Sequence, residues 1–125
     1  MTCVALVDDE APVRVALGRL LRLADYAVLP YASGEEFLDS LAAGAPDCVL
    51  LDVHMPGLTG FQVQARLRDL GLRLPVVFIT ASDDAEIERK ALEAGGIRVL
   101  RKPFGNQLLL DAVTVALNRR AGDST

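Results

Sequence analysis

The feature that most constrains the fold of this chain is a set of short apolar runs separated by longer segments. Four of these runs lie at residues 3–7, 48–51, 76–79 and 97–100. Each has the length of a β-strand, and the first three are continuously apolar, which is typical of strands covered on both faces in a parallel sheet. A fifth run, at residues 26–31, contains a proline that cannot donate to a central ladder, so it is predicted to be an edge strand.

Helical patterns occupy the segments between these runs. Apolar residues recur every three or four positions over residues 13–24, and the form of a capping box is present at 33–36 and again at 59–62. A fourth helix is expected between the acidic and glycine pairs that bound residues 83–96. A last helix is expected over 109–117. The chain therefore alternates strand and helix five times.

This alternation predicts an α/β fold with one doubly wound, five-stranded parallel sheet. Right-handed crossovers place helices on both faces of such a sheet. A length of 125 residues leaves room for one domain. We expect that domain to span residues 1–120, with 121–125 as a tail or the start of a linker.

Composition excludes several classes of function. The chain has 17 acidic and 13 basic residues, and its net charge of −4 argues against binding to a nucleic-acid backbone. No apolar run approaches the ~18 residues of a membrane span, and the N-terminus does not resemble a signal peptide, so we expect a cytoplasmic protein that does not bind membranes. Cys3 and Cys48 lie in apolar runs and are expected to be buried thiols.

Polar residues follow the apolar runs at the edge where such folds bind ligands. In an open α/β sheet this edge is formed by the carboxyl ends of the strands. The residues expected there are carboxylates, one hydroxyl and one ammonium: Asp8, Asp9, Glu10, Asp52, Thr80 and Lys102. Taken singly, each has an ordinary explanation as a solvated loop, a helix cap or a strand-end lysine.

Together these residues favour a metal and phosphoryl site. Carboxylates held close together repel one another unless a cation is shared, and oxygen ligands without Cys or His favour Mg²⁺ or a similar ion such as Mn²⁺. A hydroxyl from Thr80 and an ammonium from Lys102 beside Asp52 would form a receptacle for a phosphoryl group on that carboxylate. The covalent species would be an aspartyl phosphate.

Four motifs resemble the receiver domain of two-component response regulators. They are Val-Asp-Asp-Glu at 7–10, Leu-Leu-Asp-Val-His-Met-Pro-Gly-Leu-Thr-Gly at 50–60, Ile-Thr-Ala at 79–81 and Leu-Arg-Lys-Pro-Phe at 100–104. The resemblance extends from about residue 3 to about residue 117, in order and at the family's spacing. It implies a flavodoxin-like fold with strand order 2-1-3-4-5.

The resemblance also implies roles for individual residues. These are Asp52 as phospho-acceptor, Asp9 and Asp52 as direct Mg²⁺ ligands, Asp8 as a ligand through water, the backbone carbonyl of His54 as a further ligand, Thr80 as the switch hydroxyl and Lys102 as the phosphate-binding ammonium. A cis peptide is implied between Lys102 and the following proline.

The partners implied are those of two-component signalling. A histidine kinase or a histidine phosphotransfer protein would donate the phosphoryl group, and a downstream effector domain or protein would respond. A homodimer is compatible with this function. The domain would not contact nucleic acid itself and would have no enzymatic activity beyond its own phosphorylation and dephosphorylation.

One position departs from the family, and two other functions stay open. Many members carry Tyr or Phe three residues before the lysine, where this chain has Val99, so we expect a muted or differently routed output. An unphosphorylated docking module, a pseudo-receiver, would be consistent with Val99 alone. A phosphatase with an aspartate nucleophile would normally have an acid two residues after Asp52, where this chain has His54.

Overall fold

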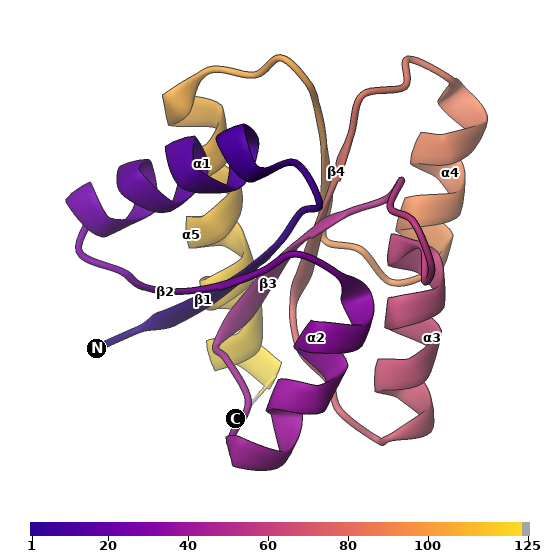
Figure 1. Ribbon diagram of the computed structural model, residues 1–125, viewed down its shortest axis with the longest axis horizontal. Helices are drawn as coiled ribbons and strands as arrows, with labels where there is room; N and C mark the ends of the chain where they lie inside the picture. The colour runs from indigo at the N-terminus through magenta and orange to yellow at the C-terminus, as the bar shows by residue number, and fades with distance from the viewer. Residues whose placement is uncertain (124–125) are drawn as a thin grey trace.

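The computed structural model describes the backbone of residues 1–123 and the side chains of residues 1–119. Its five strands form a single parallel sheet in the order β2-β1-β3-β4-β5 (Figure 1). The strands are β1 (Cys3–Val7), β2 (Ala27–Tyr31), β3 (Cys48–Asp52), β4 (Val76–Thr80) and β5 (Arg98–Arg101). The predicted flavodoxin-like α/β fold and strand order are confirmed.

Helices cover both faces of the sheet, as the alternation of strand and helix predicts. The helices are α1 (Ala11–Leu23), α2 (Gly34–Ser40), α3 (Gly60–Asp69), α4 (Ala85–Glu93) and α5 (Asn106–Asp123), with a short 3₁₀ turn at Leu41–Ala43. Successive side chains of β1 alternate between the two resulting cores. Val4 and Leu6 pack with α1 and α5, whereas Ala5 and Val7 pack with α2, α3 and α4.

The edge position of β2 is confirmed, and Pro30 lies opposite Leu6 of β1. Four of the five strands differ from their apolar runs at one end or both, and β2 begins one residue later than the run at 26–31. The predicted strand at 97–100 begins and ends one residue later, and β3 and β4 extend one residue beyond their runs to include Asp52 and Thr80. An apolar run marks only the apolar part of a strand, and the ladder continues through a buried polar residue whose backbone still pairs. For example, Lys102 N donates to Thr80 O at 2.7 Å.

The two predicted capping boxes have different outcomes. At α3, Thr59 Oγ1 accepts from Gln62 N at 3.2 Å and Gln62 Oε1 accepts from Thr59 N at 2.9 Å, so this box is complete. At α2, Ser33 Oγ accepts from Glu36 N, as predicted. The Glu36 carboxylate, however, accepts from Ala32 N rather than from Ser33 N.

Gly60, the first residue of α3, allows that helix to begin directly against the end of β3. A Cβ atom at this position would lie 2.5 Å from Asp52 O, so any side chain would displace the helix or the strand end. Gly60 N donates to Val53 O at 3.0 Å, which fixes the close approach. The loop that carries the functional residues of β3 is thereby held in a defined position.

The C-terminal helix α5 continues through Asp123, beyond the domain boundary predicted at residue 120. That boundary stays a prediction, and residues 124–125 of the predicted tail lie outside the described residues. None of the helices that the structure describes is long and apolar enough to cross a membrane.

Candidate functional site

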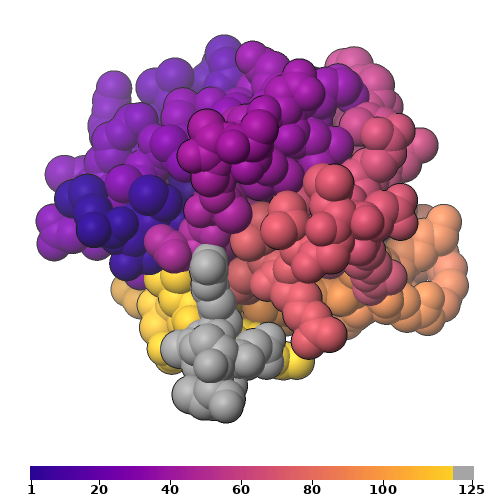
Figure 2. Space-filling view, turned by 90° about the horizontal axis from the view of Figure 1, so that it is seen from below, coloured from indigo at the N-terminus to yellow at the C-terminus, as the bar shows by residue number. Residues whose placement is uncertain are grey.

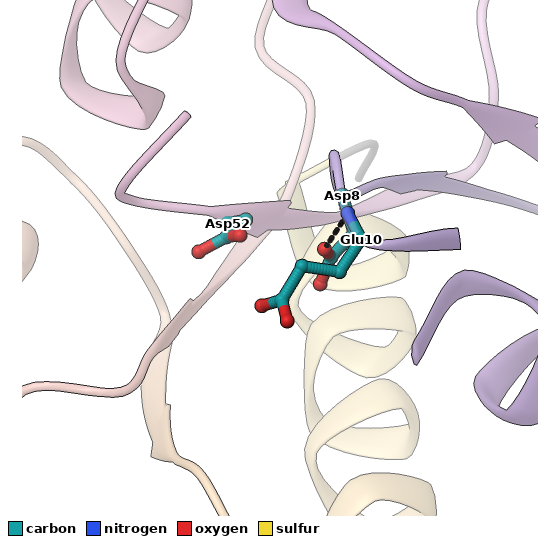
Figure 3. A group of neighbouring side chains, drawn as sticks. All are labelled: Asp8, Glu10 and Asp52. Atoms are coloured by element: carbon teal, nitrogen blue, oxygen red, sulfur yellow. Dashed lines mark hydrogen bonds between the residues drawn. The ribbon is translucent and has the colours of Figure 1, made fainter. Parts of the chain in front are cut away.

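Three carboxylates gather at the carboxyl end of the sheet. Asp52 is the last residue of β3, Asp8 follows the neighbouring strand β1, and the side chain of Glu10 turns back toward both (Figure 3). One oxygen from each of the three lies within 4.8 Å of the others. The sequence prediction that Asp8 and Asp52 share one edge of the sheet is therefore supported by the geometry.

Asp8 is held in place from several sides. Its backbone N–H donates to Tyr31 O at 3.1 Å, and Arg14 Nη1 donates to its backbone carbonyl at 2.7 Å. Its carboxylate accepts from Glu10 N at 2.9 Å, the dashed contact in Figure 3. Asp8 is fully buried. A buried carboxylate in this position needs a cationic partner.

Lys102 supplies that partner. Its Nζ atom lies 3.1 Å from Asp8 Oδ2, 3.4 Å from Glu10 Oε1 and 3.7 Å from Asp52 Oδ2. The side chain is 17% exposed, so solvent screens these charges only partly. The predicted cis peptide between Lys102 and Pro103 is present. One ammonium thus faces three carboxylates, which leaves an excess of negative charge when all are ionised.

This excess charge is visible in the acid–base behaviour of Asp52. Burial, and after it repulsion from Asp8 and Asp9, raise the pKa of the Asp52 carboxyl from 3.8 to about 7. Attraction to Lys102 and the His54 N–H, which donates to Asp52 Oδ1 at 3.3 Å, act in the opposite direction. Asp52 therefore remains partly protonated near neutral pH unless a further cation is present.

The same carboxylates also change the pKa of the Lys102 ammonium. Burial works against its charged form, but attraction from Asp52, Asp8 and Glu10 outweighs this and raises the pKa of Lys102. Lys102 therefore stays charged at physiological pH. The cluster of Asp8, Glu10 and Asp52 offers only oxygen ligands and carries an excess of negative charge. Such a cluster, which contains no Cys or His side chain, fits a hard dication such as Mg²⁺.

The other predicted site residues lie around this cluster. Thr80 is buried, and its Oγ1 accepts from Ser82 N at 3.0 Å. His54 and Asp9 are exposed, and the Asp9 carboxylate is not among the three that gather. The roles of Asp9 and of the His54 carbonyl as metal ligands stay predictions.

Glu10 was expected at this edge of the sheet, but no role in the metal site was assigned to it from the sequence. Asp8 and Glu10 lie two positions apart in the acidic triplet after β1, and they come together because Glu10 N donates to the Asp8 carboxylate. A hydrogen bond of this kind, from a backbone N–H to the Asp side chain two residues earlier, is common in turns and could have indicated Glu10.

Val99 lies on β5 opposite Phe78 and is half-buried. A cavity of about 230 Å³ lies beside it. The residues that line this cavity are Thr80, Ser82, Asp84, Glu88, Val99, Arg101 and Leu108. The small side chain of Val99 thus leaves space next to the predicted switch hydroxyl.

Residues 4–114 match the family model described as the response regulator receiver domain. The chain belongs to this family. Among curated relatives of this receiver domain, the transcriptional regulatory protein TdiR of Thauera aromatica is 41% identical over 122 residues, which are 96% of this chain and 54% of TdiR. The response regulator protein TodT of Pseudomonas putida is 36% identical over 112 residues, 90% of this chain and 49% of TodT. The receiver domain spans about half the length of these relatives.

Solved structures show the same relationship. A response regulator receiver protein from Burkholderia phymatum is 48% identical, with a TM-score of 0.84 and coverage of 94% of this chain and 96% of that one. The response regulator StyR is 36% identical, with a TM-score of 0.90 and coverage of 98% of the receiver domain and 62% of StyR. The resemblance inferred from the four motifs is confirmed.

Proposed function

We propose that this receiver domain accepts a phosphoryl group on Asp52 from the phosphohistidine of a histidine kinase or a histidine phosphotransfer protein. The observation that carries the proposal is a buried carboxylate at a strand end with Lys102 Nζ at 3.7 Å and further carboxylates beside it. A purely structural ion pair would need one acid for one lysine, whereas here three acids share Lys102.

In the proposed transfer, an Asp52 carboxylate oxygen attacks phosphorus in line with the bond to the donor imidazole nitrogen. A P–O bond forms, the P–N bond breaks, and its electron pair stays on the imidazole nitrogen. Lys102 would hold a phosphoryl oxygen through its ammonium. Only the ionised form of Asp52 is nucleophilic, so its raised pKa makes the reaction sensitive to pH and to cations.

The acidic cluster would hold Mg²⁺ or Mn²⁺. When bound, such an ion neutralises charge on the carboxylates and on the phosphoryl oxygens. Asp8 and Asp52 are the proposed ligands that already lie together, and we propose that Asp9 and the His54 carbonyl join them. Asp9 and Asp52 would bind directly and Asp8 through water, with Glu10 as a neighbouring acid.

The phosphoryl group would change the structure through Thr80. It adds a charge of about −1.5 to −2 and several acceptor oxygens. The Thr80 hydroxyl, which accepts from Ser82 N, would turn to donate to a phosphoryl oxygen and draw the loop between β4 and α4 inward. Val99 cannot follow this movement as an aromatic ring would, so the change at the surface of α4 and α5 would be muted.

The output would be read by an effector. The longer relatives include one named as a transcriptional regulatory protein, which favours a transcriptional effector in the same polypeptide or in a partner. We propose that the receiver domain itself acts in the cytoplasm without contacting DNA, with no catalysis beyond its own phosphorylation and dephosphorylation. A phosphorylation-dependent homodimer would be one form of this output.

The test is labelling of the protein with a phosphorylated histidine kinase or with acetyl phosphate. Labelling is expected to need Mg²⁺ and to be lost in Asp52→Asn. The matched control is Asp83→Asn, which removes an exposed acid outside the cluster and is expected to keep the label. Persistence of the label in Asp52→Asn would refute the assignment of the acceptor. Absence of label in the unmodified chain would instead support a pseudo-receiver.

A further inference from the structure

A second cavity, of about 250 Å³, lies at the end of the sheet opposite the phosphorylation site. Pro75 precedes β4 and Ile97 precedes β5, so the cavity lies at the amino ends of these strands. Figure 2 looks onto this end of the molecule, where the segment at residues 70–75 and part of α5 are both seen. The lining residues are Gln64, Arg68, Leu72, Arg73, Leu74, Pro75, Gly95, Ile97 and Arg119.

The charge of this cavity is opposite to that of the protein as a whole. Three arginines, Arg68, Arg73 and Arg119, reach it from three different segments, and no acid is among the lining residues that the structure describes. Within the described side chains, no carboxylate forms an ion pair with any of the three. Guanidinium groups that converge without a carboxylate partner favour a phosphate or carboxylate ligand.

Gln64, a buried side chain in the wall of this cavity, has an amide oxygen without a hydrogen-bond donor. Gln64 is only 8% exposed, and its Nε2 donates to Ala94 O at 3.0 Å. Its Oε1 is buried and accepts no hydrogen bond from the described residues. Rotating the amide would place Oε1 against the Ala94 carbonyl, so the observed orientation is fixed. A buried acceptor without a protein donor is satisfied by a bound water or by a hydroxyl or N–H donor of a ligand.

The glycine at position 95 keeps this wall open. Gly95 has a φ of +95°, and a Cβ atom there would lie 3.0 Å from Arg68 Nη2 and 3.3 Å from Gln64 Nε2. The Arg68 guanidinium also donates to Ala94 O, at 2.5 Å, which holds it at the edge of the cavity beside Gln64. The arginine and the amide are therefore positioned together by one short segment of backbone.

We infer that this cavity binds a small dianion that also carries a hydrogen-bond donor, a class that includes phosphate monoesters and hydroxy-dicarboxylates. The anionic group contacts the arginines, and the donor satisfies Gln64 Oε1. The cavity is smaller than the roughly 300–1,000 Å³ typical of sites for drug-sized ligands, which favours a compact ligand. Because the site is at the other end of the sheet from Asp52, its ligand does not overlap the proposed phosphorylation site.

The test is a titration of the ¹⁵N-labelled chain without Mg²⁺, followed by NMR. Three probes are used: glycerol 3-phosphate, L-malate and succinate. Glycerol 3-phosphate or L-malate is expected to shift the amides of Gly95 and Ile97, and whichever binds identifies the source of the anion. L-malate and succinate have the same charge and differ by one hydroxyl, so L-malate is expected to bind several-fold more tightly. In Gln64→Leu this difference is expected to disappear.

Two arginine variants, one inside and one outside the cavity, test whether binding is specific to the cavity. Arg73→Gln is expected to weaken binding about tenfold, because Arg73 is exposed in a loop and lines the cavity. Arg66→Gln removes the same charge from an exposed position of α3 outside the cavity and is expected to change affinity less than about twofold. Asp52→Asn is expected to leave binding unchanged.

Three results would overturn the inference. The first is that no probe shifts these amides at millimolar concentration. The second is that the shifts are confined to the phosphorylation site, around Thr80 and His54. The third is equal weakening by Arg73→Gln and Arg66→Gln, which would indicate nonspecific attraction. Equal affinity for L-malate and succinate in the unmodified chain would overturn the role assigned to Gln64.

Discussion

Replacement of Asp52 by asparagine is expected to stabilise the folded receiver domain above neutral pH. The side chain is nearly isosteric, so packing around β3 is retained. Asp52 is 4% exposed, and burial followed by repulsion from Asp8 raises the pKa of its carboxyl from 3.8 to about 7. In the unfolded chain the carboxyl has its ordinary pKa, so folding disfavours its charged form.

The magnitude follows from the difference between these two pKa values. Each pKa unit corresponds to about 1.4 kcal/mol, so a charged Asp52 lowers the free energy of unfolding by at most about 4 kcal/mol. This value already includes the attraction to Lys102. Because the buried amide of asparagine must itself find hydrogen-bond partners, the expected net gain is about 2 to 4 kcal/mol.

The sign of the pH dependence is fixed by the same shift. Because the pKa of Asp52 is raised on folding, the native chain binds more protons than the unfolded chain between the two values. The penalty is absent below about pH 4, grows as the pH rises toward 7, and is complete above it. The advantage of Asp52→Asn should therefore be small at acidic pH and large at alkaline pH.

Urea unfolding followed by circular dichroism measures this difference. The unmodified chain, Asp52→Asn and the control Asp83→Asn are compared at about pH 4.5, 6 and 8 with EDTA present. A stability difference between the unmodified chain and Asp52→Asn that does not grow with pH would refute the reasoning. So would a loss of stability in Asp52→Asn at alkaline pH.

Three further outcomes are expected. Mg²⁺ in excess should raise the melting temperature of the unmodified chain more than that of Asp52→Asn, because binding to the native state is coupled to folding, and equal shifts measured by calorimetry would contradict a site that includes Asp52. Gly60→Ala should lose about 1 to 3 kcal/mol in urea unfolding, since its Cβ would lie 2.5 Å from Asp52 O, and unchanged stability would show that the helix start can move freely. Val99→Tyr should enlarge the phosphorylation-dependent change in partner binding by placing a ring beside the cavity near Thr80, and an unchanged dependence in a binding assay would argue against Val99 as the cause of a muted output.

The fold could be predicted because its determinants are local and repeated. A continuous apolar run, a capping residue and a proline in the edge strand each restrict the backbone wherever they occur, and parallel strands bring their carboxyl ends to one edge. This reasoning placed Asp8, Asp52 and Lys102 near one another, as the ion pairs of Lys102 show. Strand ends were less predictable because Asp52 and Thr80 pair through their backbone despite their polar side chains.

The choice between Asp9 and Glu10 could not be made in the same way. It depends on the path of a short loop, and that path is set by the hydrogen bond from Glu10 N to the Asp8 carboxylate. The arginine-lined cavity could not be predicted from the sequence either, because it forms only in the tertiary structure. Arg68, Arg73 and Arg119 are not a charge run in the sequence, and only the packing of α3 and α5 around the start of β4 brings them together.

The two ends of the sheet show why a net charge of −4 describes this domain poorly. Lys102 is shared among three carboxylates at the carboxyl end, while three arginines meet no described acid at the other. A chain selected for stability alone would pair these charges or replace them. The raised pKa of Asp52 leaves part of this carboxyl protonated near neutral pH, and a bound cation would favour its ionised form. The repulsion that lowers stability would thus also couple the proposed phosphorylation to that cation. A substitution of Asp52 that raises stability at alkaline pH, such as Asp52→Asn, should consequently also remove the proposed phosphoryl acceptor.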